Sequence, residues 1–287
     1  MSTTASRRTL IAGVAASVCS GLAAAREPLA EIEARVGGRL GVAALHVASG
    51  RRLAHRGDER FAMCSTFKAM AVAALLQRVD AGREQLDRFV RYGAADLLSY
   101  APASKAHMAE GGMKLADLCA AAIELSDNTA ANLILGAIGG PPGWTRFVRS
   151  LGDARSRLDR TEPTLNTAIP GDPRDTATPW AMVGDLRAVL LGDALSPASR
   201  ALITGWMANC KTGQARLRAG LPAGWKVADK TGTGARGTAN DIAVAWSPSG
   251  PMVIACYLTG ATAAPDDARD AAIASVGRIV AEALARG

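Results

Sequence analysis

The chain has 287 residues, of which 49% are hydrophobic and 21% are charged, so it can bury a sizeable core and has the composition of a globular protein. Its 33 Lys and Arg against 26 Asp and Glu give a formal charge of +7, but these side chains are scattered, and aromatic residues make up only 4%. A scattered charge with few aromatic residues argues against nucleic acid as a partner and weakly favours small anionic ligands.

The first 25 residues have the features of an export signal. Arg7 and Arg8 precede an apolar run that is short for a membrane span, and small residues follow up to Ala25. Paired arginines are typical of twin-arginine export, with a Sec signal as the alternative. We therefore expect residues 1–25 to be removed, leaving a periplasmic or secreted protein with no membrane association.

The spacing of apolar residues predicts strands at both ends of the chain and helices between them. Two strands are expected at 40–47 and 52–55, joined by a turn at 48–50. Helical spacing then covers 66–79, 115–125, 129–138 and 180–191. Three more strands are predicted at 225–229, 241–246 and 252–258, and an amphipathic helix at 267–285.

These elements predict an α/β (α+β) protein in two parts. Segments 26–60 and 218–287 build an antiparallel sheet domain flanked by helices, and 61–217 form an inserted all-helical domain, with the active site in the crevice between them. The loop at 157–175 is polar, rich in proline and too long for an ordinary connection. Such loops in compact domains are usually functional or disordered.

Cysteine and histidine residues point to no metal or other cofactor. The four cysteines after the predicted signal, at 64, 119, 210 and 256, have apolar neighbours, which favours buried free thiols over one bridge. The three histidines, His46, His55 and His107, do not lie at ligand spacing.

Ser65 and Lys68 lie three residues apart at the start of a predicted helix, so their side chains share one face. A serine hydroxyl is a poor nucleophile at neutral pH, and an amine within reach can activate it. A helix cap and a surface lysine are the commoner uses of these two residue types.

Two further short motifs allow both structural and chemical interpretations. Ser-Asp-Asn at 126–128 can cap the following helix, or supply a hydroxyl that passes a proton and an amide that holds a carbonyl. Lys-Thr-Gly occurs twice: the copy at 211–213 resembles a helix C-terminus, whereas the copy at 230–232 ends the predicted strand 225–229. Glycines after a strand let a ligand approach the backbone, so we favour the second copy.

In chain order, Ser-x-x-Lys, Ser-Asp-Asn and Lys-Thr-Gly are the motif set of class A β-lactamases and penicillin-binding proteins. Together with Asp-Arg-Thr-Glu-Pro-Thr-Leu-Asn at 159–166 and Arg-Asp-Thr at 174–176, they make the chain similar to a class A serine β-lactamase over nearly all of the mature sequence. The resemblance implies the fold predicted above and hydrolysis of penicillins and cephalosporins, conferring antibiotic resistance. It also implies a monomer whose partners are small-molecule β-lactams.

The resemblance assigns the covalent chemistry to a small set of residues. Ser65 is the nucleophile, with its own N–H and that of Thr233 as the oxyanion hole. Lys68 or Glu162, the latter through a water, takes the Ser65 proton. Ser126 then protonates the departing ring nitrogen.

The loop is expected to supply deacylation. Glu162 and Asn166 hold and activate the hydrolytic water, an ion pair between Arg160 and Asp175 closes the loop, and the bond from Glu162 to Pro163 is expected to be cis. A weak surface ion pair is the alternative interpretation of Arg160 and Asp175.

Further residues are expected to bind the drug. The resemblance places Asn128 at the side-chain amide, Lys230 and Thr231 at the carboxylate, Gly232 and Thr233 along the strand, and Tyr100 at the mouth of the pocket. Many members carry another arginine in the next strand, where this chain has Ala239. Arg216 is our candidate for that role and Arg269 a weaker one, with an ordinary surface arginine as the alternative for both.

Some relatives form disulfides to Cys64 or Cys119 from positions that hold no cysteine in this chain. Gly234 stands where a partner for Cys64 would be, and Val72 where one for Cys119 would be, so neither bridge is expected.

Two other functions share the three motifs. A cell-wall D,D-peptidase normally lacks the long loop, and a β-lactam sensor that stays acylated usually belongs to a membrane-anchored chain. Glu162 and Asn166 therefore favour a hydrolase, whose substrate spectrum the sequence does not define.

Overall fold

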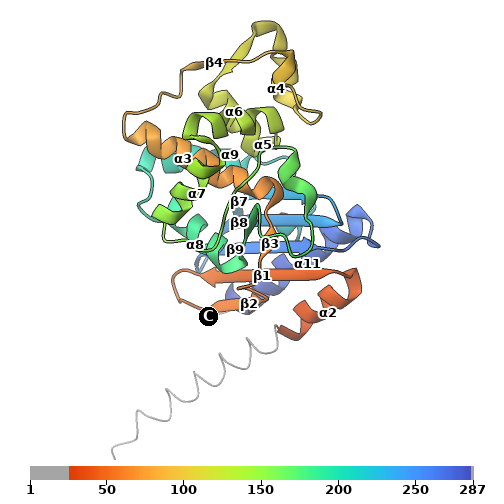
Figure 1. Ribbon diagram of the computed structural model, residues 1–287. Helices are drawn as coiled ribbons and strands as arrows, with labels where there is room; N and C mark the ends of the chain where they lie inside the picture. Colours follow the sequence, from red (N-terminus) through yellow and green to blue (C-terminus); the bar gives the residue numbers. More distant parts are fainter. Residues whose placement is uncertain (1–25, 286–287) are drawn as a thin grey trace, which may run out of the picture.

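The computed structural model describes residues 26–285. The predicted export signal at 1–25 lies outside the described residues. A sheet occupies the lower half of the molecule in Figure 1, and most helices lie above it.

A five-stranded antiparallel sheet joins the two ends of the chain, in the order β2-β1-β9-β8-β7. Its strands are β1 (Arg39–His46), β2 (Arg52–His55), β7 (Lys226–Gly234), β8 (Thr238–Ser247) and β9 (Gly250–Thr259). β1 and β9 pair along their whole length, with Arg39 opposite Thr259 and His46 opposite Met252. The predicted fold class, with an antiparallel sheet from both ends and flanking helices, is confirmed.

Alternate strand residues pack against helices on opposite faces of this sheet, as the pleat requires. Val42 and Ala44 share a core with α2 (Arg26–Val36) and α11 (Asp266–Ala285). Ala43, between them, belongs to the core on the other face, where α8 (Pro179–Leu190) packs against β1, β8 and β9.

The rest of the chain surrounds α3 (Phe67–Asp80), whose residues from Phe67 to Leu76 are all buried. A helix that is apolar all round belongs inside a protein, and α3 contacts α5, α6, α7 and α9. The other helices are α4 (Pro102–Ala106), α5 (Leu115–Glu124), α6 (Asn128–Ile138), α7 (Gly140–Ser150), α9 (Pro197–Ala208) and α10 (Leu217–Gly220).

Short elements complete the fold. β3 (Phe61–Ala62) pairs with β6 (Thr176–Ala177), and β4 (Phe89–Arg91) with β5 (Gly112–Lys114). The 3₁₀ turns are η1 (Cys64–Thr66), η2 (Ala94–Asp96), η3 (Met108–Glu110) and η4 (Thr164–Thr167). The pairing of β3 with β6 brings the end of the long loop beside the start of η1.

The last three strands are longer than predicted: β8, expected at 241–246, begins at Thr238, and β9, expected at 252–258, begins at Gly250. The strand expected at 225–229 continues as β7 to Gly234, because its residues keep pairing with β8 until Gly234 lies opposite Thr238. The second Lys-Thr-Gly is therefore inside an edge strand and not beyond its end. The domain limits at 61 and 218 stay a prediction.

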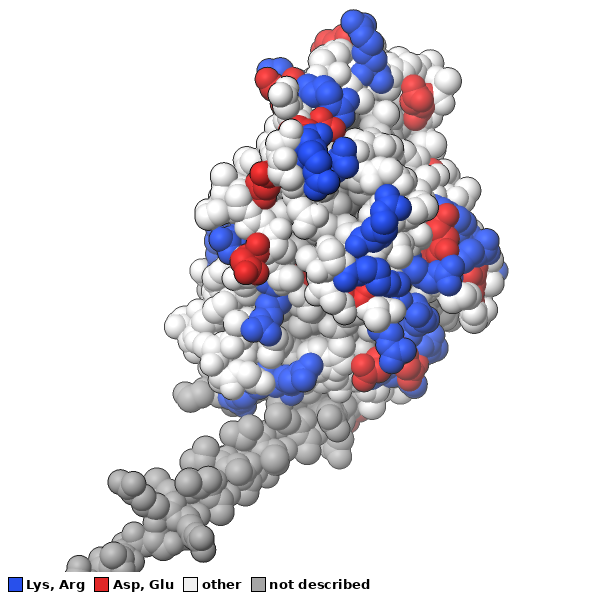
Figure 2. Space-filling view, turned by 60° about the vertical axis from the view of Figure 1, so that its left-hand side comes forward, with Lys and Arg blue, Asp and Glu red and all other residues white. Residues whose placement is uncertain are grey.

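The described residues also bear on the expectations about membranes, metals, cysteines and charge. No helix between residues 26 and 285 has the length and apolar character needed to cross a membrane. The same residues hold no group of three His, Cys, Asp or Glu side chains arranged for a metal. The four cysteines in this range are buried and free. On the face shown in Figure 2, basic and acidic side chains lie interspersed.

Candidate active site

Ser65 lies in η1, directly before the buried helix α3. Its neighbour Cys64 has a left-handed backbone, with φ of 46°, which is uncommon for a residue with a side chain and often marks a functional site. The hydroxyl does not cap a helix: Ser65 Oγ donates to Glu162 Oε1 at 3.2 Å. The capping alternative therefore does not apply to Ser65.

Lys68 is fully buried, so it is not the surface lysine of the alternative interpretation. Its Nζ lies 3.0 Å from Glu162 Oε1 and donates to Ser126 O at 2.8 Å and to Asn128 Oδ1 at 2.6 Å. Burial lowers the pKa of Lys68, while the charge and hydrogen bond of Glu162 oppose that shift.

Ser126 lies between two lysines. Its Oγ accepts from Lys230 Nζ at 3.1 Å and lies 3.4 Å from Lys68 Nζ. The cap of α6 comes from Asp127, whose Oδ1 accepts from Ala130 N at 2.9 Å, which leaves the Ser126 hydroxyl for the lysines. Burial lowers the pKa of Lys230 to about 8.

The loop at 157–175 points Glu162 at this group. Asn132 on α6 accepts from Glu162 N at 3.0 Å and donates to Glu162 O at 2.9 Å, so the main chain of Glu162 is held from both sides. Asn166 Nδ2 donates to Glu162 Oε2 at 2.5 Å. Asn166 Oδ1 is buried and has no hydrogen-bond partner among the described residues. The Glu162–Pro163 bond is cis.

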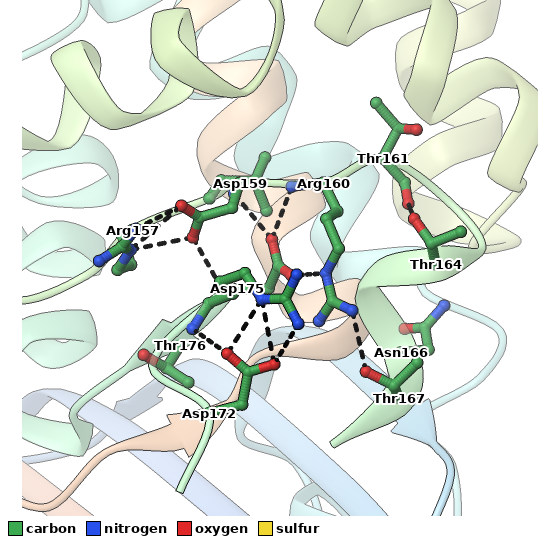
Figure 3. Close-up of polar contacts among 12 residues, drawn as sticks. Arg157, Asp159, Arg160, Thr161, Thr164, Asn166, Thr167, Asp172, Asp175 and Thr176 are labelled. Atoms are coloured by element: carbon green, nitrogen blue, oxygen red, sulfur yellow. Dashed lines mark hydrogen bonds and ion pairs between the residues drawn. The ribbon is translucent and has the colours of Figure 1, made fainter. Parts of the chain in front are cut away.

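The ends of the loop are joined through Asp175, at the centre of Figure 3. Asp175 Oδ2 pairs with Arg160 Nε at 2.6 Å, and Asp175 Oδ1 accepts from the N–H groups of Asp159 and Arg160. Arg160 Nη1 also donates to Thr167 Oγ1 at 3.1 Å. Because the Asp175 side chain is only 1% exposed, this pair is not the weak surface bridge of the alternative interpretation.

Arg216 is buried behind β7. Its Nη2 donates to Thr233 Oγ1 at 2.8 Å and its Nη1 to Gly232 O at 2.9 Å, while Asp270 on α11 pairs with its Nε at 2.7 Å. Arg269 instead donates to the carbonyl groups of the 261–264 segment.

These groups surround a cavity of about 350 Å³. Its lining consists of Ser65, Tyr100, Ser126, Asn128, Asn166, Thr212, Arg216, Thr231, Gly232 and Thr233. Lys68 and Glu162 lie behind this lining, in contact with Ser65 or its neighbours. The structure thus brings all the predicted catalytic and substrate-binding residues to one site, with Arg160 and Asp175 at the base of its loop.

Sequence reasoning missed three residues that position this site. Thr212 belongs to the first Lys-Thr-Gly, which we set aside, yet its Oγ1 lies 2.5 Å from Thr231 Oγ1. Asn132 follows Asn128 by four residues, and this helical spacing could have placed it on the same face. Nothing in the sequence pattern links Asp270 to Arg216, 54 residues away.

Comparisons with known proteins agree on one family. A family model described as "Beta-lactamase enzyme family" matches residues 24–284. Beta-lactamase OXY-2 of Klebsiella oxytoca is 48% identical over 262 residues, covering 91% of this chain and 90% of that protein. Beta-lactamase CTX-M-25 of Escherichia coli is 46% identical over 282 residues, covering 98% and 95%.

Solved structures give the same result. The ancestral (GNCA) class A β-lactamase superposes with a TM-score of 0.88 at 60% identity, covering 91% of this chain and 100% of that one. The putative class A β-lactamase PenP from Rhodopseudomonas palustris has a TM-score of 0.89 at 56% identity, covering 91% and 100%.

Proposed function

The chain belongs to the class A serine β-lactamases, and from that premise we propose how its residues divide the hydrolysis of a β-lactam. The enzyme opens the β-lactam amide bond, an activity that gives antibiotic resistance. One observation supports the assignment of roles above all others. A single carboxylate oxygen, Glu162 Oε1, lies 3.2 Å from Ser65 Oγ and 3.0 Å from Lys68 Nζ.

Acylation begins at Ser65. Its Oγ attacks the lactam carbonyl carbon and gives its proton to Glu162, the acceptor it already contacts. Negative charge then develops on the carbonyl oxygen, which the N–H groups of Ser65 and Thr233 stabilise. Loss of one oxyanion-hole donor typically costs about 3 kcal/mol of transition-state stabilisation. Because the donor at position 233 is a main-chain N–H, Thr233 contributes to the oxyanion hole through its backbone.

The ring nitrogen leaves as the tetrahedral intermediate collapses, and it needs a proton. Ser126 is placed to supply it, because its Oγ lies beside both Lys68 and Lys230. These two amines stabilise the oxygen as it gives up its proton, and Lys68 can replace that proton. Lys68 then recovers a proton from Glu162, whose Oε1 lies 3.0 Å from its Nζ, so Glu162 is a carboxylate again before deacylation.

Deacylation is the task of the loop. Glu162 takes a proton from a water that attacks the Ser65 ester and returns it to Ser65 Oγ as the ester bond breaks, and Asn166 holds that water. The buried, unpartnered Oδ1 of Asn166 supports this role, since a buried acceptor without a donor is costly unless a ligand or water supplies one.

Binding of the drug relies on β7 and the helical side of the cavity. Lys230, Thr231 and Arg216 receive its carboxylate, Arg216 through Thr233 Oγ1. Asn128 meets the side-chain amide of the drug, and Tyr100, which is 51% exposed, lies at the cavity mouth.

Glu162→Ala tests this division of roles. Without Glu162, Lys68 loses a charge and a hydrogen bond that raise its pKa, so this pKa falls further and the buried amine becomes the better acceptor for the Ser65 proton. We expect the variant to react once with a chromogenic cephalosporin and then remain acylated, as mass spectrometry would show. Turnover at the parent's rate would refute the assignment.

The same assay separates the hydrolase from a peptidase or a sensor. The parent protein should turn over steadily, whereas a single stoichiometric burst would support either alternative. We further propose that the mature enzyme is monomeric and exported after removal of residues 1–25. Light scattering and N-terminal sequencing of the protein from cell fractions test these two points.

A further inference from the structure

A second cavity, of about 560 Å³, borders the loop that carries Glu162 and is larger than the substrate cavity of about 350 Å³. Its walls come from the loop at 165–174, from the start of β1, from β3, and from the turn between β7 and β8. Among the described residues, none lines both cavities: Leu165 faces this one and Asn166 the other. We call it the loop-side cavity.

The wall of the loop-side cavity is largely apolar. Phe61, Leu165, Ile169 and Pro170 contribute to it, and the Ile169 side chain remains 43% exposed. Cavities of about 300–1,000 Å³ with apolar walls and a few convergent polar groups are the usual form of a small-molecule site. Size and lining therefore suit a ligand with an apolar body.

The polar groups of the cavity are mainly arginines, and most are already neutralised. Arg39 pairs with Glu59, Arg160 with Asp175, and Arg174 with Asp172.

Two arginines of the wall remain without a carboxylate. Arg60 Nη1 donates only to neutral acceptors, Arg155 O at 2.7 Å and Thr176 Oγ1 at 3.1 Å. Among the side chains that the structure describes, at 28–285, no carboxylate pairs with Arg60 or Arg236. The loop-side cavity therefore has two positive charges available to an anion.

The turn that carries Arg236 is fixed in place. Gly260 N donates to Arg236 O at 2.9 Å, and Ala235 N donates to Asn166 O at 2.9 Å. A ligand that contacts Arg236 and Leu165 would thus contact two segments that are hydrogen-bonded through Asn166. Such a ligand would hold the turn and the loop together.

We propose that the loop-side cavity is a second ligand site, which takes a small amphipathic anion of the aryl or alkyl carboxylate class. The apolar body of the ligand lies against Leu165 and Ile169, and its carboxylate meets Arg60 and Arg236. Charge-assisted hydrogen bonds to a guanidinium fix its orientation.

Titration calorimetry with 1-naphthoate tests this proposal, and the neutral 1-naphthalenemethanol measures the contribution of the charge. We expect saturable binding of the acid and much weaker binding of the alcohol. Arg236→Gln should weaken binding of the acid about tenfold, the usual effect of losing a charged hydrogen bond. Ile169→Glu, which brings a negative charge to the wall, should weaken it more.

Matched variants elsewhere show whether these effects are local. Arg83→Gln and Leu202→Glu make the same changes at exposed positions outside the cavity and should leave binding intact. We expect Arg216→Ala to weaken carboxylate binding in the substrate cavity, so naphthoate binding that keeps its affinity in this variant belongs to the loop-side site. Absence of saturable binding, or loss of binding in Arg216→Ala but not in Ile169→Glu, would overturn the proposal.

Discussion

The side-chain amide of Asn132, on α6, makes two hydrogen bonds to the main chain of Glu162: its Oδ1 accepts from Glu162 N at 3.0 Å and its Nδ2 donates to Glu162 O at 2.9 Å. The helix that places Asn128 in the substrate cavity therefore also sets the position of the loop carboxylate. A backbone clamp of this kind positions the whole residue, whereas Asn166 holds only the side chain, at Oε2.

Asn132→Ala should therefore slow deacylation more than acylation. The substitution leaves the backbone N–H and C=O of Glu162 without partners, at a cost of about 1–3 kcal/mol for each buried group. We expect an acyl-enzyme that accumulates in stopped-flow and mass-spectrometric measurements, together with a lower melting temperature. Asn209→Ala, at an exposed asparagine, is the control. Unchanged steady-state turnover would show that the clamp has no catalytic role.

The buried ion pair between Arg160 and Asp175, which we call the clasp, gives a second prediction. Arg160→Gln leaves the nearly buried carboxylate of Asp175 without its cation, and breaking a buried pair in this way costs about 3–5 kcal/mol. Chemical denaturation should show that the free energy of unfolding falls by an amount near the lower end of that range, because the Arg160 side chain is itself 19% exposed. Deacylation should also slow.

Arg174→Gln is the matched control for the clasp, since it breaks the exposed pair with Asp172 in the same loop. We expect it to change stability and turnover little. Equal losses in the two variants would mean that the burial of Asp175 does not set the strength of the clasp.

Arg216 makes a prediction about substrate binding. Arg216→Ala should raise KM at least about tenfold for β-lactams that carry a carboxylate, the usual cost of one charged hydrogen bond, and should lower kcat less. Arg269→Ala should leave KM unchanged, because its guanidinium is occupied by carbonyl groups of the 261–264 segment. The opposite pattern would move the role to Arg269.

Much of the fold was predictable because its elements obey short-range rules. Helix α3 was expected at 66–79 and runs from Phe67 to Asp80, since its apolar residues have unbroken helical spacing. Helix α7 was missed. It opens with Gly140, Pro141 and Pro142, which look like a turn, but proline is well tolerated in the first turn of a helix because its missing N–H has no partner there.

The site residues that could be predicted from the sequence are those that belong to short motifs. Ser65, Lys68 and Ser126 belong to short stretches whose spacing is local. Thr212 and Asp270 were not predicted, because their contacts with Thr231 and Arg216 depend on how strands and helices pack across 19 and 54 residues of sequence. A motif shows which residues can do chemistry, but tertiary packing decides which others hold them.

Lys230 makes the final prediction, which concerns pH. Burial lowers its pKa to about 8 from its ordinary value of 10.5, so the folded enzyme loses this positive charge as the pH rises through about 8. KM for a carboxylate-bearing β-lactam should therefore increase above pH 8, whereas the methyl ester of the same drug should show a flat profile.

The same pKa shift predicts that, above pH 8, Lys230 makes the protein more stable while substrate binding becomes weaker. Between pH 8 and 10.5 the unfolded chain binds this proton more tightly than the folded enzyme, so the contribution of Lys230 to the free energy of unfolding rises with pH across that window. An increase in KM in this range therefore cannot come from unfolding caused by Lys230. If KM for the free carboxylate stayed constant up to pH 10, Lys230 would not be the group that binds it.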